Sequence, residues 1–455
     1  MNKEKIGKYI KFLRERNNLT QEELAKKVPV TREAVSKWET GRRIPDIETL
    51  IILSKIFNVP IESLLSGEES NNAVVNLYKD NKKSDDTYIT FKNEYKFEEN
   101  EDTIIFVDEV QESPEFIEEL KYLCEVHNNL NIIVAGSLLG IKLKRCGLSF
   151  PVGKVWMIDM FPMDFEEFLL AIKGEDIINM IKSSYKNNKP LGEGIHNMLL
   201  TYYKYFLITG GMPDSVNNLL ENNLEIMKYD SNTITSIISS YFNDMGKYVT
   251  NNSETIKILS TYKSIPYQLT NKSNKFQYSK ITNGAKSREY ELPIDWLLET
   301  NLTIKCNLVK TPEIPLKGFI DITNFKLYMS DTGILNVSLN ITKEQILEDK
   351  IGLYKGAVTE NYVANQLLIN DFPLYYWESS GEAEVDFLIT TNDGVIPIEV
   401  KAADNTKSKS LKIYTEKYKP KYSIKISTKN FGFDKRNNIK SVPLYAVFCI
   451  KENTD

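Results

Sequence analysis

The stretch that decides the fold of the first part of the chain covers residues 19–65. It reads LTQEELAKKVPVTREAVSKWETGRRIPDIETLIILSKIFNVPIESLL. Its apolar residues recur at intervals of three and four, as they do on the inner faces of short helices. Two helix starts are marked: Thr20 precedes Glu23 with the spacing of a capping box, and Thr31 precedes an amphipathic stretch as an N-cap. Gly41 then closes the second of these helices.

The helical pattern continues on both sides of this pair. Before it, Ile6, Ile10 and Leu13 recur at helical spacing. After it, Asp46 caps a further helix and Pro60 opens another. The sequence therefore predicts a small all-α domain at the N-terminus.

The order and spacing of these helices closely resemble the Cro/repressor-type (XRE-like) helix-turn-helix family. The resemblance implies that residues 1–66 bind double-stranded DNA, with the helix that opens near Thr31 in the major groove. It also implies a homodimer, because repressors of this type bind paired half-sites. Pro29 departs from the family, which usually has Gly or Asn in this turn. The side chains that the resemblance places at the bases are Thr31, Arg32, Glu33, Ser36 and Lys37, and those at the phosphates are Gln21, Arg42 and Arg43.

Composition and charge support a cytoplasmic, multidomain protein. The 455 residues suffice for about three or four domains. Residues 1–66 carry 13 Lys and Arg against 9 Asp and Glu, whereas the whole chain has a net charge of −5. A local excess of positive charge on an acidic chain points to a segment that meets phosphates. We expect no membrane association, because no apolar run approaches the roughly 18–20 residues that cross a bilayer. Four scattered cysteines without a CxxC pair predict neither a zinc site nor a disulfide framework.

A polar linker over 67–86 precedes two runs that resemble the Walker B and sensor strands of P-loop ATPases. Ile104–Val107 ends in Asp108-Glu109, and a second run ends in Ser137. Together with "FVDEVQ", "AGSLLG", "FPMDFEEFL" and "GGMPDSV", they resemble a prokaryotic AAA-like ATPase family with a C-terminal domain of unknown function. The resemblance implies that Asp108 holds Mg²⁺, Glu109 polarises water and Ser137 senses the γ-phosphate.

The phosphate-binding loop GxxxxGK[ST] is missing from the sequence. The nearest Gly-Lys pair, Gly153-Lys154, is followed by Val155 and lies after the Walker B strand. Without the loop amides and its Lys, ATP loses most of its binding partners. We therefore predict that residues 87–220 form a truncated P-loop-NTPase-like α/β core without ATPase activity. An ATP-gated regulator, with nucleotide bound in an altered way, is the alternative.

Residues 221–345 combine helices with short strands. The stretch "REYELPIDWLLETNL" predicts a helix with Leu292, Trp296 and Leu297 facing inward, and strands follow at Thr303–Val309 and Lys326–Ser330. Helices followed by a small β-ribbon resemble a winged helix, which the ATPase family has at this place. We predict a winged-helix-like packing module.

A β-hairpin is predicted near the C-terminus, because two alternating strands flank Thr391-Asn392-Asp393-Gly394. With Asn392-Asp393 as the loop, Asp386 pairs with Glu399; with Asp393-Gly394 as the loop, Asp386 pairs with Lys401. Either register gathers the three side chains on one face, with opposed Cβ atoms about 5 Å apart.

This arrangement resembles the PD-(D/E)XK nuclease core. The resemblance implies that residues 346–455 form a restriction-endonuclease-like α/β domain. It implies that Asp386 and Glu399 bind Mg²⁺, that Lys401 orients water or steadies the transition state, and that Glu360 adds a carboxylate from the preceding helix. An ordinary surface hairpin with the same residues is the alternative.

The sequence thus predicts a multidomain α and α/β protein. Its expected function is sequence-specific DNA binding as a transcriptional regulator, with a degenerate ATPase region. The alternative is a metal-dependent DNA nuclease that the helix-turn-helix domain directs to its target. No cofactor is certain from the sequence; Mg²⁺ at Asp386 and Glu399 fits the nuclease alternative, and ATP is not expected.

Overall fold

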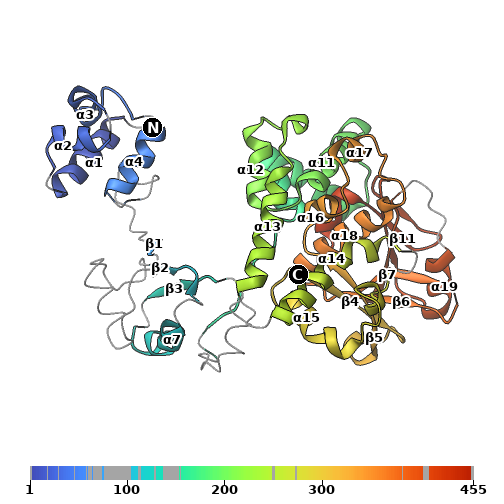
Figure 1. Cartoon of the computed structure of the whole chain (residues 1–455). Helices are drawn as coiled ribbons and strands as arrows, with labels where there is room; N and C mark the ends of the chain where they lie inside the picture. Colours follow the sequence, from blue (N-terminus) through green and yellow to red (C-terminus); the bar gives the residue numbers. More distant parts are fainter. Residues whose placement is uncertain are drawn as a thin grey trace. The chain divides into compact units, whose positions relative to one another are not determined.

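The computed structural model of the chain forms two compact units, Met1–Met157 and Ile158–Asp455, and each is described by itself (Figure 1). None of the described helices is both long enough and apolar enough to span a membrane. The residues that the structure describes are 3–17, 19–28, 30–45, 47–57, 59, 64, 74–75, 104–110, 114–127, 130–136, 153, 155–247, 252–271, 274–381, 383–402 and 409–451.

The described N-terminal residues form the first four of the predicted helices. Thr20 closes a capping box with Glu23, and the Thr31 hydroxyl accepts from the backbone N–H of Ala34. Both predicted N-caps are therefore confirmed. Pro29, Asp46 and Pro60, to which further roles were assigned, lie outside the described residues. The helices are α1 (Lys3–Arg16), α2 (Gln21–Lys27), α3 (Arg32–Glu39) and α4 (Ile47–Phe57).

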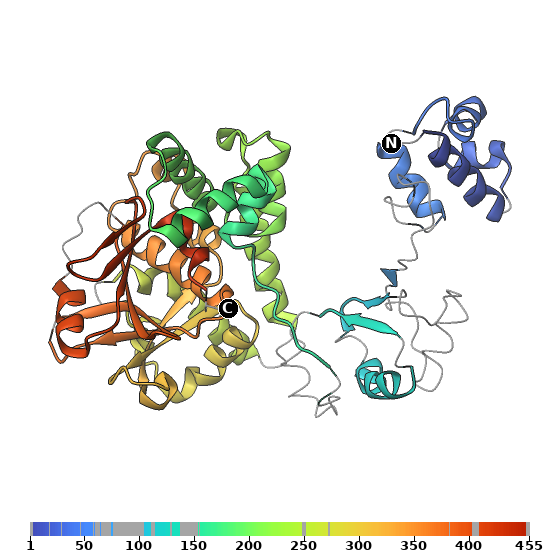
Figure 2. The ribbon, with the colours of Figure 1, turned by 180° about the vertical axis from the view of Figure 1, so that it is seen from behind.

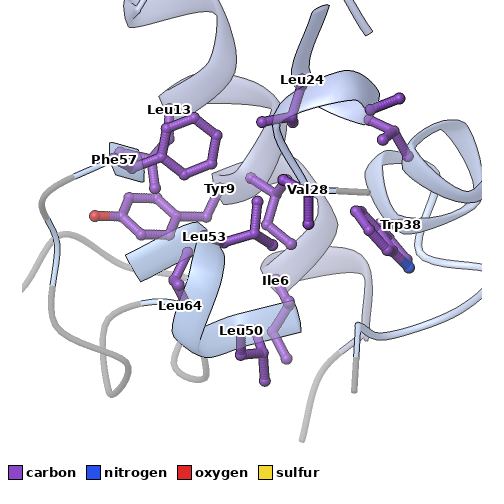
Figure 3. Packing of buried hydrophobic residues seen from close by; sticks show 13 residues of the cluster. Ile6, Tyr9, Leu13, Leu24, Val28, Trp38, Leu50, Leu53, Phe57 and Leu64 are labelled. Atoms are coloured by element: carbon purple, nitrogen blue, oxygen red, sulfur yellow. The ribbon is translucent and has the colours of Figure 1, made fainter. Parts of the chain in front are cut away.

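The inner faces of these helices form one apolar core (Figure 3). Ile10, Leu24, Val35 and Leu53 are fully buried at its centre. Burying an aliphatic side chain of this size contributes about 1.5–3 kcal/mol, so this cluster supplies most of the domain's stability.

Gly7 lets α1 pack closely on the end of α3. A Cβ atom added at this position would lie 2.2 Å from the carbonyl oxygen of Trp38. That oxygen also accepts a hydrogen bond from the amide of Gly41, at 2.9 Å, and is therefore held in place. The packing of α1 on α3 thus requires glycine at position 7.

A three-stranded parallel sheet is also part of the first unit. Its order is β1 (Val74–Val75), β2 (Ile104–Val107) and β3 (Asn131–Val134), and α7 (Pro114–Val126) connects the last two. The two strands of the ATPase-like segment are thus confirmed. Val74 and Val75 lie inside the predicted linker and yet form a strand.

The second unit begins with a run of helices that precedes its first strand. In both views α12 and α13 lie at one side of this unit and α19 at the other (Figures 1 and 2). The prediction for Leu292 is wrong: its side chain is 70% exposed, because Tyr290, Pro293 and Ile294 supply the inner face of that turn. The helices are α9 (Phe165–Lys173), α10 (Glu175–Asn187), α11 (Glu193–Thr209), α12 (Pro213–Glu221), α13 (Asn232–Lys247), α14 (Asn252–Leu269), α15 (Ser287–Glu299), α16 (Thr332–Ser338), α17 (Lys343–Leu347), α18 (Tyr354–Ile369) and α19 (Lys409–Tyr418), with 3₁₀ turns at Ile226–Lys228, Tyr278–Lys280, Leu316–Phe319 and Leu444–Cys449.

An eight-stranded mixed sheet, in the order β10-β11-β9-β8-β7-β6-β4-β5, forms the rest of the unit. The expected boundary between residues 345 and 346 does not separate two sheets, because β4 pairs with β6. Likewise, residues 158–220, expected in the ATPase core, lie in the second unit. The strands are β4 (Thr303–Val309), β5 (Ile320–Met329), β6 (Tyr375–Glu378), β7 (Glu384–Thr391), β8 (Gly394–Val400), β9 (Ser423–Ser427), β10 (Gly432–Asp434) and β11 (Ile439–Pro443).

Three sequence motifs meet around Gly211. Its carbonyl accepts from the amide of Met163 at 2.8 Å, and its own amide donates to Asp331 Oδ2 at 2.7 Å. Asp331 also caps α16 by accepting from Ile334 N at 2.9 Å. A Cβ atom at position 211 would lie 2.1 Å from the carbonyl oxygen of Met163. Hydrogen bonds around Gly211 therefore hold three stretches of the sequence together: "FPMDFEEFL", "GGMPDSV" and "FKLYMSDTGIL".

We predict that Gly7→Ala destabilises the helix-turn-helix domain by about 1–3 kcal/mol, the usual cost of overpacking a core. The measurement is hydrogen exchange of α1 and α3 amides in the full chain, which reports the local free energy of unfolding. Gly194→Ala is the control, because a Cβ atom there meets nothing within 4 Å. Equal protection of α1 in the Gly7→Ala variant and the unmodified chain would contradict the prediction.

Candidate nucleic-acid interface and acidic centre

One face of α3 is free of core contacts. Val35 and Trp38 point inward and are buried. The Thr31 hydroxyl accepts from the Ala34 amide at 3.3 Å and so fixes the start of the helix. Of the side chains predicted to meet bases, Ser36 is half-buried and the others are exposed: Thr31, Arg32, Glu33 and Lys37. The geometry presents these polar groups together on the solvent side of one helix.

A buried ion pair locks α3 against α1. Arg14 on α1 donates from Nε to Glu39 Oε1 at 2.5 Å and from Nη2 to Oε2 at 3.1 Å. A second branch of the guanidinium donates to the carbonyl of Leu19 at 2.8 Å. The hydrogen bond to the Glu39 carboxylate raises the pKa of Arg14 above its ordinary value. This bidentate contact fixes the last residue of α3 to α1.

Gln21 joins the same network from α2. Its amide Nε2 donates to Glu39 Oε2 at 2.8 Å. A side-chain amide has two N–H donors, and this bond orients the group. The start of α2 and the end of α3 are thereby held at a fixed separation.

Arg42 and Arg43 follow α3 in a tight turn. Gly41 adopts a left-handed φ of 70°, and the amides of both arginines donate to the carbonyl of Lys37. Both side chains are exposed. The turn therefore places two cations directly after the helix.

The residues expected to handle nucleotide lie at the end of β2. Asp108 is exposed, and its Oδ1 accepts from the amide of Glu109 at 3.0 Å. Glu109 has a left-handed φ of 52°, a conformation that costs free energy for a residue with a Cβ atom. Ser137 lies outside the described residues. Asp108 here caps the turn that follows the strand.

The C-terminal hairpin takes the register with Asn392-Asp393 as the loop. Thr391 pairs with Gly394 and Phe387 with Ile398, so Asp386 lies opposite Glu399. Asp386 Oδ2 accepts from the amide of Val400 at 2.7 Å. The two carboxylates are therefore neighbours across the two strands.

Lys401 is partly exposed and pairs with Glu399. Its Nζ lies 2.5 Å from Glu399 Oε1. The other oxygen, Oε2, is buried and has no hydrogen-bond donor among the described residues. A buried carboxylate oxygen without a donor costs about 1–3 kcal/mol or more, which a cation would offset.

Glu360 on α18 is held by several donors. Its Oε1 accepts from Lys326 Nζ at 2.8 Å and from the Tyr328 hydroxyl at 2.6 Å, and its Oε2 accepts from Asn274 at 2.8 Å. Glu384 Oε1 lies 2.5 Å from the same ammonium group. One oxygen each of Glu360, Glu384 and Asp386 lies within 4.8 Å of the others. We call these three carboxylates, with Glu399, Lys326 and Lys401, the acidic centre.

Sequence reasoning missed Lys326 and Glu384. Lys326 stands in the apolar stretch "FKLYM", where a charge inside a strand signals a buried partner. Glu384 precedes Asp386 by two residues, and strand alternation puts both on one face. Both signals were in the sequence and could have been used.

Comparison with known protein families finds four matching segments along the chain. A helix-turn-helix model matches residues 10–64 and an AAA domain model matches 54–169. Two domains of unknown function, DUF8612 and DUF4143, match residues 200–345 and 355–446.

The HTH-type transcriptional activator BcrR of Enterococcus faecalis is 54% identical over 57 residues, which are 12% of this chain and 28% of that protein. The HTH-type transcriptional regulator ImmR of Bacillus subtilis is 31% identical over 124 residues, 26% of this chain and 96% of ImmR. The chain belongs to the HTH-type transcriptional regulators.

Among solved structures, the likeness of this HTH-type regulator is more distant. The Walker-type ATPase PABY2304 of Pyrococcus abyssi aligns with 72% of this chain and 82% of its own, at 14% identity and a TM-score of 0.32. The regulator spans 28% and 53% of two of its relatives, BcrR and YqaE of Bacillus subtilis, so its N-terminal domain carries the relationship.

The acidic centre of the regulator concentrates charge away from water. Burial raises the pKa of Asp386 well above its usual range, and the carboxylates of Glu360 and Glu399 raise it further. Burial alone would lower the pKa of Lys326, but the surrounding carboxylates outweigh it and raise that pKa. The pKa values of both groups therefore lie above their ordinary values, that of Lys326 because of the neighbouring carboxylates and that of Asp386 mainly because of burial.

We predict that Asp386→Asn stabilises the second unit at pH 8 in the presence of EDTA. A carboxyl group with a raised folded-state pKa binds its proton more tightly in the folded chain, so its cost grows as pH rises above about 4. The melting temperature should rise by about 2–4 °C at pH 8 and by less at pH 5. Asp393→Asn is the control, because Asp393 lies in the hairpin turn and pairs with Lys421. A lower melting temperature at pH 8 would refute the prediction.

Proposed function

We propose that the chain is a sequence-specific DNA-binding transcriptional regulator. Membership of the HTH-type regulators supports this, and the single observation that carries it is the exposed polar face of α3. The N-cap of α3 and the hydrogen bond from Arg14 to Glu39 hold this helix in place. Neither contact uses the side chain of Arg32 or Lys37. Phosphate contacts supply affinity, and base edges supply specificity.

Roles for the individual side chains follow from their positions. We assign base contacts to Thr31, Arg32, Glu33, Ser36 and Lys37, and phosphate contacts to Gln21, Arg42 and Arg43. We further propose that the regulator is a cytoplasmic homodimer without membrane association, since proteins of this type bind paired half-sites. The ATPase-derived segment would then serve oligomerisation or partner contact. Without a phosphate loop in the sequence, we do not assign ATP hydrolysis to Asp108 and Glu109.

We predict that Arg32→Ala combined with Lys37→Ala weakens binding to a duplex enriched from a random DNA pool by about tenfold to a thousandfold. Two cations are lost from the face proposed to meet DNA, so the salt dependence of binding should also become less steep. Fluorescence anisotropy at several salt concentrations measures both. The control is Lys11→Ala, an exposed lysine on α1 that pairs with Glu15. Equal affinity of the double variant and the unmodified chain would refute the proposal.

A second candidate function is metal-dependent cleavage of DNA by the acidic centre. The buried Oε2 of Glu399 has no donor among the described residues, and the adjacent carboxylate of Asp386 completes a pair that suits a divalent cation. Bound there, Mg²⁺ would lower the pKa of an attacking water and offset phosphate charge. The ammonium group of Lys401 holds the Glu399 carboxylate in position and adds a positive charge beside it. We therefore propose Asp386 and Glu399 as the metal ligands of this activity.

We predict that, if the chain is a nuclease, plasmid DNA is nicked in Mg²⁺ and not in EDTA, and that Asp386→Ala reduces the rate at least about a hundredfold. Gel electrophoresis of purified chain with supercoiled plasmid measures this. Asp393→Ala, outside the centre, should cleave normally. Cleavage that persists in Asp386→Ala would come from a contaminant and would remove the nuclease candidate.

A further inference from the structure

Lys326 is a fully buried lysine whose partners come from distant parts of the chain. It lies on β5, whereas Glu360 and Glu384 follow it by 34 and 58 residues. Its ammonium group also lies 4.9 Å from the ring centre of Tyr376. An ion withdrawn from water needs this kind of complete surrounding, because desolvation alone costs several kcal/mol.

The same contacts occupy two of the carboxylates that could otherwise bind a metal ion. Glu360 accepts from Lys326, Tyr328 and Asn274, so both of its oxygens are already engaged. Glu384 Oε1 faces the ammonium group as well. Asp386 and Glu399 are different: their hydrogen bonds come from the Val400 amide and from Lys401, and Glu399 Oε2 has no donor among the described residues.

We propose that Lys326 is a built-in cation of the acidic centre, which occupies Glu360 and Glu384 and thereby leaves only Asp386 and Glu399 for a divalent metal ion. The metal site at Asp386 and Glu399 rests on the second candidate function, whereas the occupation of Glu360 and Glu384 by Lys326 does not. The lysine supplies permanently the positive charge that a second metal ion would bring. The acidic centre is thus limited to one divalent ion among the carboxylates that the structure describes there.

The test is the stoichiometry of Mn²⁺ binding to the full chain, measured by calorimetry, together with melting temperatures in EDTA and in Mn²⁺. Lys326→Met should bind one ion more than the unmodified chain. In EDTA its melting temperature should fall by about 10 °C, because the carboxylates lose their counter-ion. Mn²⁺ should recover most of this loss in the variant and change the unmodified chain much less. The matched control is Lys305→Met on the neighbouring strand, whose ammonium lies over the Phe325 ring.

The outcomes separate this proposal from the nuclease candidate. An unmodified chain that binds no Mn²⁺, with a gain in Lys326→Met, supports the built-in cation and removes the nuclease candidate. One ion in the unmodified chain, lost in Asp386→Asn, and a second ion in Lys326→Met support both. The same stoichiometry and the same Mn²⁺-induced shift in both chains overturn the proposal.

A variant that fails to fold in EDTA but folds in Mn²⁺ also supports the proposal. For a variant that folds in neither, Lys326→Met is combined with Glu384→Gln, which removes one of the two carboxylates that lost their partner. The double variant should again bind one ion more than the unmodified chain, through Glu360 and Asp386. No gain there overturns the proposal.

Discussion

The buried contact between the Lys326 ammonium group and two carboxylates is the constraint on which the second unit depends. It joins β5, an edge strand of the eight-stranded sheet, to α18 and β7. The first unit applies the same principle, since Arg14 and Glu39 tie α1 to α3. In both places, a charge withdrawn from water is stabilised by a partner remote in sequence, and the partner fixes how two elements meet.

The motifs that made the middle of the chain recognisable serve its construction. Gly211 has no room for a side chain against Met163, and Asp331 accepts from both Gly211 and Ile334. None of these groups lies among the carboxylates of the acidic centre. A stretch can therefore identify a family because the fold requires it, while the chemistry belongs to other residues.

The sequence predicted best what is decided locally. The caps at Thr20 and Thr31 and the strand Thr303–Val309 depend on residues a few positions apart, and all three are confirmed. The hairpin register remained open because two loops suited the same turn, and only the pairing of Phe387 with Ile398 decided it. The contacts of Lys326 could not be predicted in this way, since they depend on the packing of a helix and a strand that follow much later.

The network of Arg14, Gln21 and Glu39 separates the residues that hold α3 from those that α3 displays. Glu39 is buried at the end of the helix, and the exposed side chains on the opposite face take no part in that network. Apart from Thr31, whose hydroxyl also caps α3, substitutions on the displayed face therefore leave the scaffold intact. A lineage can change the DNA site that such a protein reads through a few exposed positions, so its targets can diverge while its fold stays the same.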